Sequence, residues 1–330
     1  MKTPIISGVI VFIIISSALL ILGPQRIALA NTEHGDEYLN QVLEESSQSG
    51  HNELSAFTLI GDDLTFAGIG ADENTEFEIG SVTKTFTTEI LRQQVESGDI
   101  ALDTTVGEII DAEGTDVADV TMLELAEHTS GLPRLDSDNL GIMKALFQKN
   151  PYAGISQEDV FDAARNASTD GRGEEEYSNF GAALLGQLLA VNVNSDYATL
   201  IEGNILAPAG MSDTYVATLG SVDENAPRGL AANGRQTSEW EMGGYAPAGA
   251  IRSTAADMAK YAQFIMDNSQ FEYGWEPEES GGIWHNGGTG GYSTMLIVDP
   301  ETDESYFVNG NTPQGVEDIA RSLRSAGANS

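Results

Sequence analysis

A serine and a lysine three residues apart form the first group in this sequence that could do covalent chemistry. Ser81 and Lys84 stand at the start of an expected helix, residues 83–96. Residues three apart share one face of a helix, so the hydroxyl and the amine are expected to point into the same volume. A serine needs a neighbouring base to act as a nucleophile, and an unpaired N–H at a helix start can bind a developing oxyanion. Taken alone, this spacing is common, and a capping serine with a solvated lysine is the simpler interpretation.

Two further segments carry polar side chains that could act on the same substrate. Tyr177 and Asn179 form a Tyr-x-Asn tripeptide just ahead of an apolar run. His285 begins a His-Asn-Gly-Gly segment, in which Gly287 and Gly288 precede a strand-like stretch. Taken singly, Tyr177 could cap a helix, and His285 could be a strand histidine satisfied by backbone groups.

The order and wide spacing of these segments resemble the family of penicillin-recognising serine hydrolases, in its class C β-lactamase, D-alanyl carboxypeptidase and esterase branch. That branch carries the motifs Ser-x-x-Lys, Tyr-x-Asn and Lys/His-x-Gly in this order. Two more stretches are similar to the same branch, Glu-His-Thr-Ser-Gly-Leu-Pro at 127–133 and Ala-Gly-Ala-Ile-Arg-Ser-Thr-Ala-Ala-Asp-Met at 248–258. The resemblance covers about residues 38–322, nearly all of the chain after its first 30 residues.

The resemblance implies a role for each motif residue. Ser81 would attack a carbonyl carbon and form an acyl-enzyme, while Lys84 would help to remove its proton. Tyr177 would share the base role and pass the proton to the leaving group, with its pKa lowered by the charge of Lys84. Asn179 would bind Lys84 or the substrate amide. The remaining motif residues would line the substrate site: His285, Gly287 and Gly288. The N–H groups of Gly288 and Ser81 would together form an oxyanion hole.

Position 285 departs from the lactamase-type motif, which has lysine there. A lysine is cationic near neutral pH, whereas a histidine loses its charge above about pH 6.5. Lysine at this position favours substrates with a carboxylate, such as penicillins and D-alanyl peptides, and histidine is common among the esterases, amidases and peptidases of the family. If His285 recognises an anion, activity is expected to fall between about pH 6 and 8 as the imidazole loses its proton.

These residues predict an extracytoplasmic serine hydrolase that acts through an acyl-enzyme on an ester, amide or peptide bond. A dedicated β-lactamase or a D-alanyl-D-alanine carboxypeptidase is the alternative within the family. An alternative of another class is a non-catalytic sensor that binds penicillin or peptides. The expected partner is a small-molecule or peptide substrate. The sequence does not define the oligomeric state, although a monomer is expected.

The composition argues against several other functions. The 330 residues include no cysteine, which excludes disulfides and a thiol nucleophile. The net charge is −36, from 51 acidic and 15 basic residues, and such a surface repels nucleic acid and anionic membranes. The four histidines are scattered, without metal-binding spacing, and His34 and His51 are expected to be exposed. We therefore predict neither a metal site nor a cofactor.

The first 30 residues differ from the rest of the chain. Lys2 precedes an apolar stretch, residues 5–22, and Ala28-Leu29-Ala30 offers a small-x-small cleavage site. We interpret residues 1–30 as a secretory signal peptide. The 18-residue stretch is also near the lower limit for a membrane span, so an uncleaved membrane anchor is the alternative. Either would place the catalytic part outside the cytoplasm.

The segments that must position the motifs have a clear order along the chain. Strands are expected near both ends, at 54–60, 64–69, 293–298 and 305–309. Helices are expected in the middle, at 122–127, 142–148, 158–166, 180–191 and 197–205, and also at 36–48, 254–266 and 316–323.

This order predicts one α/β (α+β) domain over residues 31–330, with an antiparallel sheet flanked by helices and an inserted all-helical region. The sheet part would comprise about 31–102 and 213–330, and the helical part about 103–212. The resemblance implies the same β-lactamase/transpeptidase-like layout, with the active site in the groove between the two parts.

Overall fold

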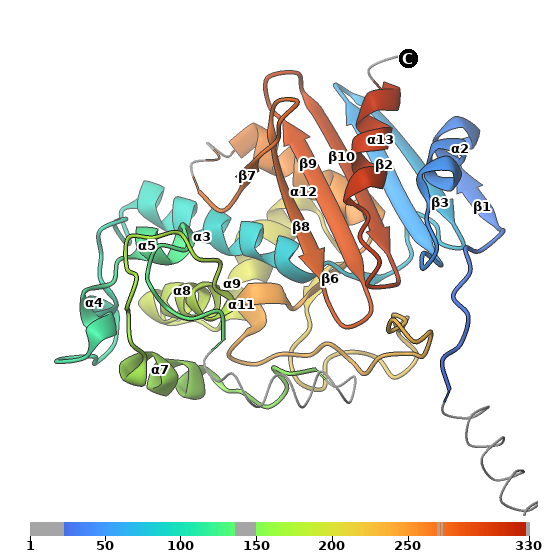
Figure 1. Cartoon of the computed structure of the whole chain (residues 1–330). Helices are drawn as coiled ribbons and strands as arrows, with labels where there is room; N and C mark the ends of the chain where they lie inside the picture. Colours follow the sequence, from blue (N-terminus) through green and yellow to red (C-terminus); the bar gives the residue numbers. More distant parts are fainter. Residues whose placement is uncertain (1–22, 136–149, 269–270, 272, 328–330) are drawn as a thin grey trace, which may run out of the picture.

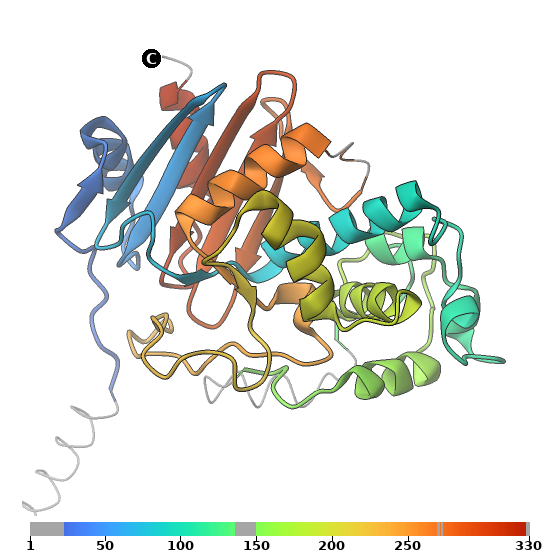
Figure 2. The same cartoon turned by 180° about the vertical axis from the view of Figure 1, so that it is seen from behind.

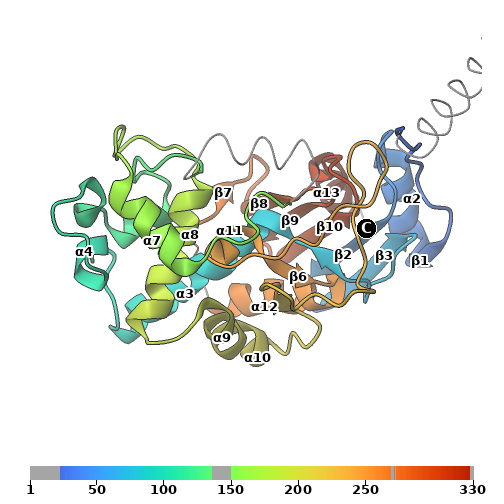
Figure 3. The same cartoon turned by 90° about the horizontal axis from the view of Figure 1, so that it is seen from below.

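The computed structural model describes residues 23–135, 150–268, 271 and 273–327. A sheet with helices on both faces lies beside a mainly helical region (Figures 1 and 3). The predicted fold class is therefore confirmed. The expected helix at 142–148 lies outside the described residues.

The sheet is built from both ends of the chain. Within the described residues it has seven strands, all paired antiparallel, in the order β1-β3-β2-β10-β9-β8-β7. The strands expected near the two ends of the chain form two hairpins. The hairpins meet where Phe57 pairs with Phe307, whose rings stack with their centres 5.4 Å apart. Aromatic and β-branched residues favour such strands. In spatial order the strands are β1 (Glu33–Gly35), β3 (Asp63–Ile69), β2 (Leu54–Ile60), β10 (Glu304–Gly310), β9 (Ser293–Asp299), β8 (Ile283–Gly288) and β7 (Glu276–Pro277).

Helices cover both faces of this sheet (Figures 1 and 2). One face is covered by α2 (Glu37–Ser46) and α13 (Glu317–Gly327). The opposite face is covered by α12 (Ala255–Asn268). The Thr254 hydroxyl accepts a hydrogen bond from Asp257 N–H (3.1 Å) at the start of α12, so Thr254 caps this helix. A second, smaller sheet has the order β4 (Phe77–Glu78), β6 (Ile251–Ser253), β5 (Tyr215–Val216).

The helical region surrounds α8, which is buried along nearly its whole length. Such a helix is apolar on every side because it forms the centre of its layer. The expected helix at 197–205 begins at Tyr197 as predicted and continues through a wider turn, Glu202–Leu206. The helices here are α3 (Thr83–Ser97), α4 (Val106–Ile109), α5 (Met122–Ala126), α7 (Gln157–Asn166), α8 (Asn179–Asn192), α9 (Tyr197–Ile201), α10 (Ala207–Ala209) and α11 (Ala246–Gly249).

Two observations concern the N-terminal part. The prediction that His51 is exposed is wrong, since it is 2% exposed, accepts a hydrogen bond at Nδ1 from Gln48 N–H (2.9 Å) and has Nε2 3.0 Å from Gly315 O. Residues 23–30 lie along the folded body, where Asn52 donates to Ala28 O (2.7 Å) and accepts from Ala30 N–H (2.8 Å). Residues 1–22 are outside the described part, within which no helix is long and apolar enough to cross a membrane.

Candidate active site

Ser81 lies in a short 3-10 turn, η1 (Gly80–Val82), that runs directly into α3. Gly80 has a φ of 52°, a conformation that favours glycine. One helical turn further on, the Lys84 side chain returns to the serine, and its Nζ lies 3.0 Å from Ser81 Oγ. The prediction from the three-residue spacing is confirmed.

The Lys84 amine is buried and has a full set of neighbours. Besides Ser81, its Nζ contacts Asn179 Oδ1 at 2.8 Å and Ala248 O at 2.7 Å. Burial, with a smaller contribution from the charge of Arg134, holds the pKa of Lys84 well below its ordinary value of 10.5. A larger share of this amine is therefore neutral, and only a neutral amine can accept a proton.

Tyr177 precedes α8 and reaches Ser81 from the helical region. Its hydroxyl donates a hydrogen bond of 2.7 Å to Ser81 Oγ. The Tyr177 ring packs against the ring of His128 at 4.8 Å, and His128 Nδ1 accepts from Ser178 N–H (3.3 Å). His128 thus helps to orient the tyrosine.

The pKa of Tyr177 corrects one expectation. Burial raises this pKa to about 12, although the hydrogen bond to Ser81 and the charge of Arg134 act to lower it. The expected lowering by Lys84 is therefore wrong, because removal of the phenolate from water outweighs the favourable charge. The nearby cation that does favour the phenolate is Arg134.

Asn179 is the first residue of α8, and its side-chain amide forms hydrogen bonds with two other residues of the site. The oxygen accepts from Lys84, and the Nδ2 group donates to Tyr152 Oη at 3.0 Å. The predicted contact between Asn179 and Lys84 is confirmed.

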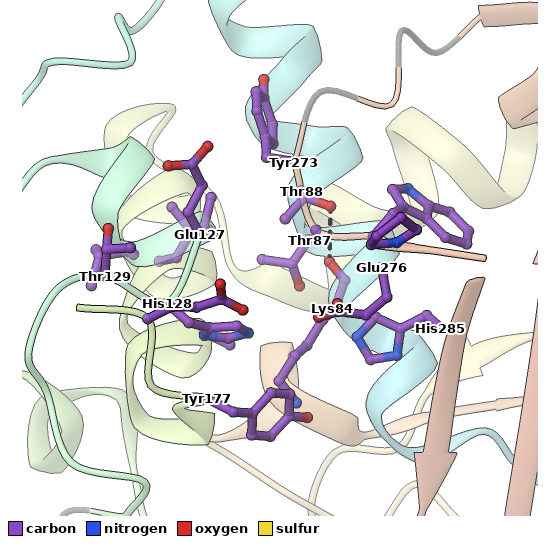
Figure 4. Close-up of a pocket in the computed structure, with 18 residues that line it drawn as sticks. Lys84, Thr87, Thr88, Glu127, His128, Thr129, Tyr177, Tyr273, Glu276 and His285 are labelled. Atoms are coloured by element: carbon purple, nitrogen blue, oxygen red, sulfur yellow. Dashed lines mark hydrogen bonds between the residues drawn. The ribbon is translucent and has the colours of Figure 1, made fainter. Parts of the chain in front are cut away.

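His285 lies on β8, with its side chain 7% exposed. Figure 4 shows Lys84 between Tyr177 and His285. His285 Nδ1 is 2.6 Å from Asn286 O. Burial, assisted by the charge of Lys84, lowers the pKa of His285 to about 3. The imidazole is neutral from pH 6 to 8, so the expected loss of an anion-binding charge in that range is wrong.

Gly287 and Gly288 bring the backbone of β8 against the turn that carries Ser81. A Cβ on Gly287 would stand 2.0 Å from Ile79 O and 3.0 Å from Ser81 N, so only glycine fits there. Gly288 is exposed and lines the same cavity as Ser81. This proximity is what an oxyanion hole requires, and the hole itself stays a prediction.

Two cavities meet at Tyr177. The larger, of about 890 Å³, is lined by Ser81, Asn179 and Gly288. The smaller, of about 380 Å³, is lined by Lys84 and His285 and is drawn in Figure 4. Tyr177 lines both cavities, so its side chain can contact molecules bound in either one.

Some contributors to the site were not predicted. Arg134, Tyr152 and the carbonyl of Ala248 all contact the motif residues. Arg134 directly follows the stretch 127–133, and Ala248 begins the stretch 248–258, so their positions beside known motifs were a usable signal. Tyr152 has no such signal in the sequence.

Comparison with known proteins identifies a family and related folds. A profile of the β-lactamase family matches residues 27–271. The human "Putative beta-lactamase-like 1" is 26% identical over 70% of this chain and 49% of its own, and a β-lactamase of Providencia stuartii is 25% identical over 72% and 58%. The chain thus spans about half the length of these relatives. The solved β-lactamase/D-alanine carboxypeptidase of Yersinia pestis shares the fold, with a TM-score of 0.71, 19% identity, and coverage of 88% of this chain and 98% of that one.

Proposed function

The chain belongs to the β-lactamase family, and on this premise we propose that it is an extracytoplasmic serine hydrolase working through an acyl-enzyme. One observation carries the proposal: the Ser81 hydroxyl contacts both the Lys84 amine (3.0 Å) and the Tyr177 hydroxyl (2.7 Å). A serine between two proton-transfer groups is the arrangement that nucleophilic catalysis needs.

Lys84 is the group that takes the serine proton. A neutral lysine has two N–H bonds, which suit the carbonyl of Ala248 and the amide oxygen of Asn179, and one lone pair, which then faces Ser81 Oγ. The lowered pKa of Lys84 increases the share of the amine that is in this neutral state.

Tyr177 is better suited to give a proton than to take one. Its pKa of about 12 keeps the hydroxyl protonated, and it borders both cavities. Ser81 Oγ forms a bond to the carbonyl carbon as its proton moves to Lys84, and the oxyanion is held by the N–H groups of Ser81 and Gly288. The bond to the leaving group then breaks as Tyr177 donates its own proton to the leaving-group atom, and the proton that Lys84 took from Ser81 moves to Tyr177 to replace it. A water molecule repeats the sequence on the acyl-enzyme and releases the acid and free Ser81.

The neutral state of His285 bears on the choice of substrate. A position without charge offers no ionic contact to the carboxylate of a penicillin or a D-alanyl peptide. We therefore place esters, amides and other peptides first, with a dedicated β-lactamase or D-alanyl-D-alanine carboxypeptidase second. Retention of Ser81, Lys84 and Tyr177 in contact weighs against a non-catalytic sensor.

The location and the partner are part of the same proposal. The charged and then apolar pattern of residues 1–30 supports export, through either a cleaved signal peptide or an anchor. The proposed partner is a small-molecule or peptide substrate. Detection of the protein in a cytoplasmic fraction alone would contradict the proposed location.

A substrate panel tests the function on the full chain. We expect the wild type to hydrolyse a short-chain 4-nitrophenyl ester, and Ser81→Ala to show neither turnover nor labelling by a fluorophosphonate. Faster turnover of a penicillin than of any ester would favour the β-lactamase alternative. Labelling by fluorescent penicillin without turnover of any substrate would favour the sensor.

A further inference from the structure

The two cavities beside Tyr177 differ in the charge of their walls. The smaller one is lined by three exposed glutamates, Glu127, Glu175 and Glu276. Among the described residues that line the larger one there is no aspartate or glutamate, and the one charged side chain is Arg134. In a chain with 51 acidic residues, a cavity wall whose described residues carry one cation and no carboxylate suits an anion.

Arg134 is held at the edge of the larger cavity. Its guanidinium lies 5.1 Å from the centre of the Tyr177 ring, a contact that orients the side chain through the cation–π attraction. None of the ion pairs formed among the described residues includes Arg134. The planar guanidinium thus keeps its donors available for a carboxylate, which it can bind through two parallel hydrogen bonds.

The position of the reacting atoms decides which end of a substrate Arg134 meets. The carbonyl carbon must bond to Ser81 and its oxygen must lie by Gly288, and both residues line the larger cavity. The remainder of the acyl group therefore extends into that cavity. A carboxylate on the leaving group would instead enter the smaller cavity and face Glu127, Glu175 and Glu276, where like charges repel.

We propose that Arg134 is a specificity-determining residue that binds a carboxylate on the acyl part of the substrate. This proposal rests on the proposed hydrolase function. It narrows the substrate class to compounds in which one carboxyl group of a dicarboxylic acid forms the ester or amide and the other stays free, such as monoesters or monoamides of dicarboxylic acids. Arg134 supplies the positive charge that the neutral His285 does not.

Hydrolysis of three esters by the full chain tests whether Arg134 binds a carboxylate on the acyl part or on the leaving group. 4-Nitrophenyl hexanoate is neutral, mono-4-nitrophenyl adipate carries a carboxylate at the far end of its acyl chain, and the hexanoate ester of 5-hydroxy-2-nitrobenzoate carries it on the leaving group. The measured quantity is the ratio of kcat/KM for each anionic ester to that for the neutral one. Using a ratio within each variant cancels any common effect of Arg134 on Lys84 and Tyr177.

We expect Arg134→Gln to lower the ratio of kcat/KM for the adipate ester to that for the neutral ester about tenfold. This effect is at the lower end of the range for a hydrogen bond to a charged group, because Arg134 is exposed to solvent. Arg134→Lys should keep part of the preference, since it keeps the charge and loses the paired donors. The matched control is Arg165→Gln, which removes one positive charge from α7, away from both cavities, and should keep the wild-type ratio. The ratio for the leaving-group carboxylate should not depend on Arg134.

An adipate ratio unchanged in Arg134→Gln, with both esters still hydrolysed, would overturn the assignment while leaving the hydrolase function intact. A dependence on Arg134 confined to the leaving-group carboxylate would overturn the acyl-side placement. If the wild type hydrolysed none of the three esters, both proposals would fail.

The salt dependence of the wild type gives a measurement that needs no variant. Its preference for the adipate ester should shrink between about 0.1 M and 1 M salt, since the screening length falls from about 10 Å to 3 Å. A preference independent of salt would contradict an ionic contact.

Discussion

Gly287→Ala is the substitution that most sharply tests how β8 supports catalysis. The added Cβ would stand 2.0 Å from Ile79 O, whereas ordinary contacts begin at 3.4 Å, so strand and turn must separate by about 1.4 Å (3.4 − 2.0). The nearest group beyond this carbonyl is Ser81 N, at 3.0 Å. Misplacement of reacting groups by 1 Å can cost about 100-fold in rate, and loss of an oxyanion donor costs roughly 100- to 1,000-fold. We therefore expect kcat to fall at least about 100-fold, with KM little changed because the contact is made in the transition state.

Stability should respond to the same clash. Forcing extra atoms into a packed contact typically costs about 1–3 kcal/mol, which urea unfolding followed by circular dichroism can measure. The neighbouring residue gives the control, because a Cβ on Gly288 meets nothing within 4 Å and exposed substitutions usually stay within about 0.5 kcal/mol. Gly288→Ala should unfold as the wild type does and keep far more activity than Gly287→Ala. Wild-type kcat in Gly287→Ala, or equal losses in the two variants, would refute the reasoning.

Three further predictions follow from buried polar groups. Tyr177→Phe keeps the ring against His128 and removes the hydroxyl from Ser81, so ester kcat should fall about 10²- to 10⁴-fold without loss of fold; near-normal kcat would exclude Tyr177 from the proton path. Burial lowers the pKa of His128 from 6.5 to about 4, so between these pH values His128 is protonated in the unfolded chain and neutral in the folded chain. The resulting stability is complete above pH 6.5 and is lost as the pH falls towards 4, by roughly 2–3 kcal/mol; urea unfolding should fall less steeply with pH in His128→Gln, and identical slopes would count against it. Arg252 is 1% exposed and pairs with Glu78 at 3.0 Å, so Arg252→Met should cost about 3–5 kcal/mol by leaving a buried carboxylate unpaired. Because burial raises the pKa of Glu78 to about 7, that loss should be larger at pH 8.5 than at pH 6, and a loss independent of pH would disprove the explanation.

Much of the fold was accessible from the sequence because its signals are local. Helix spacing predicted that Lys84 lies beside Ser81, and the order of apolar segments predicted the strands near both ends of the chain and the helix at 254–266. The meeting of Tyr177 with Ser81 came from the family resemblance and not from any local pattern. Residues 96 apart cannot be paired by periodicity alone.

The errors arose where burial by distant segments decides the outcome. The charge of Lys84 is evident from the sequence, whereas the packing that removes Tyr177 and His285 from water is not. The pKa of Tyr177 was therefore expected too low and the pKa of His285 too high. His51 was expected at the surface, and it is buried by contact with Gly315, which lies 264 positions later in the chain. Charges can be counted in a sequence, whereas their solvent exposure depends on tertiary packing.

The central claim is that Ser81 is the nucleophile, prepared by Lys84 and Tyr177. The direct measurement is mass spectrometry of the intact full chain after reaction with a fluorophosphonate, followed by peptide mapping of the modified residue. One adduct per chain, located on Ser81 and absent from Ser81→Ala, is the predicted result. A chain that hydrolyses esters while Ser81 stays unmodified, or that carries the adduct on another residue, would contradict the claim.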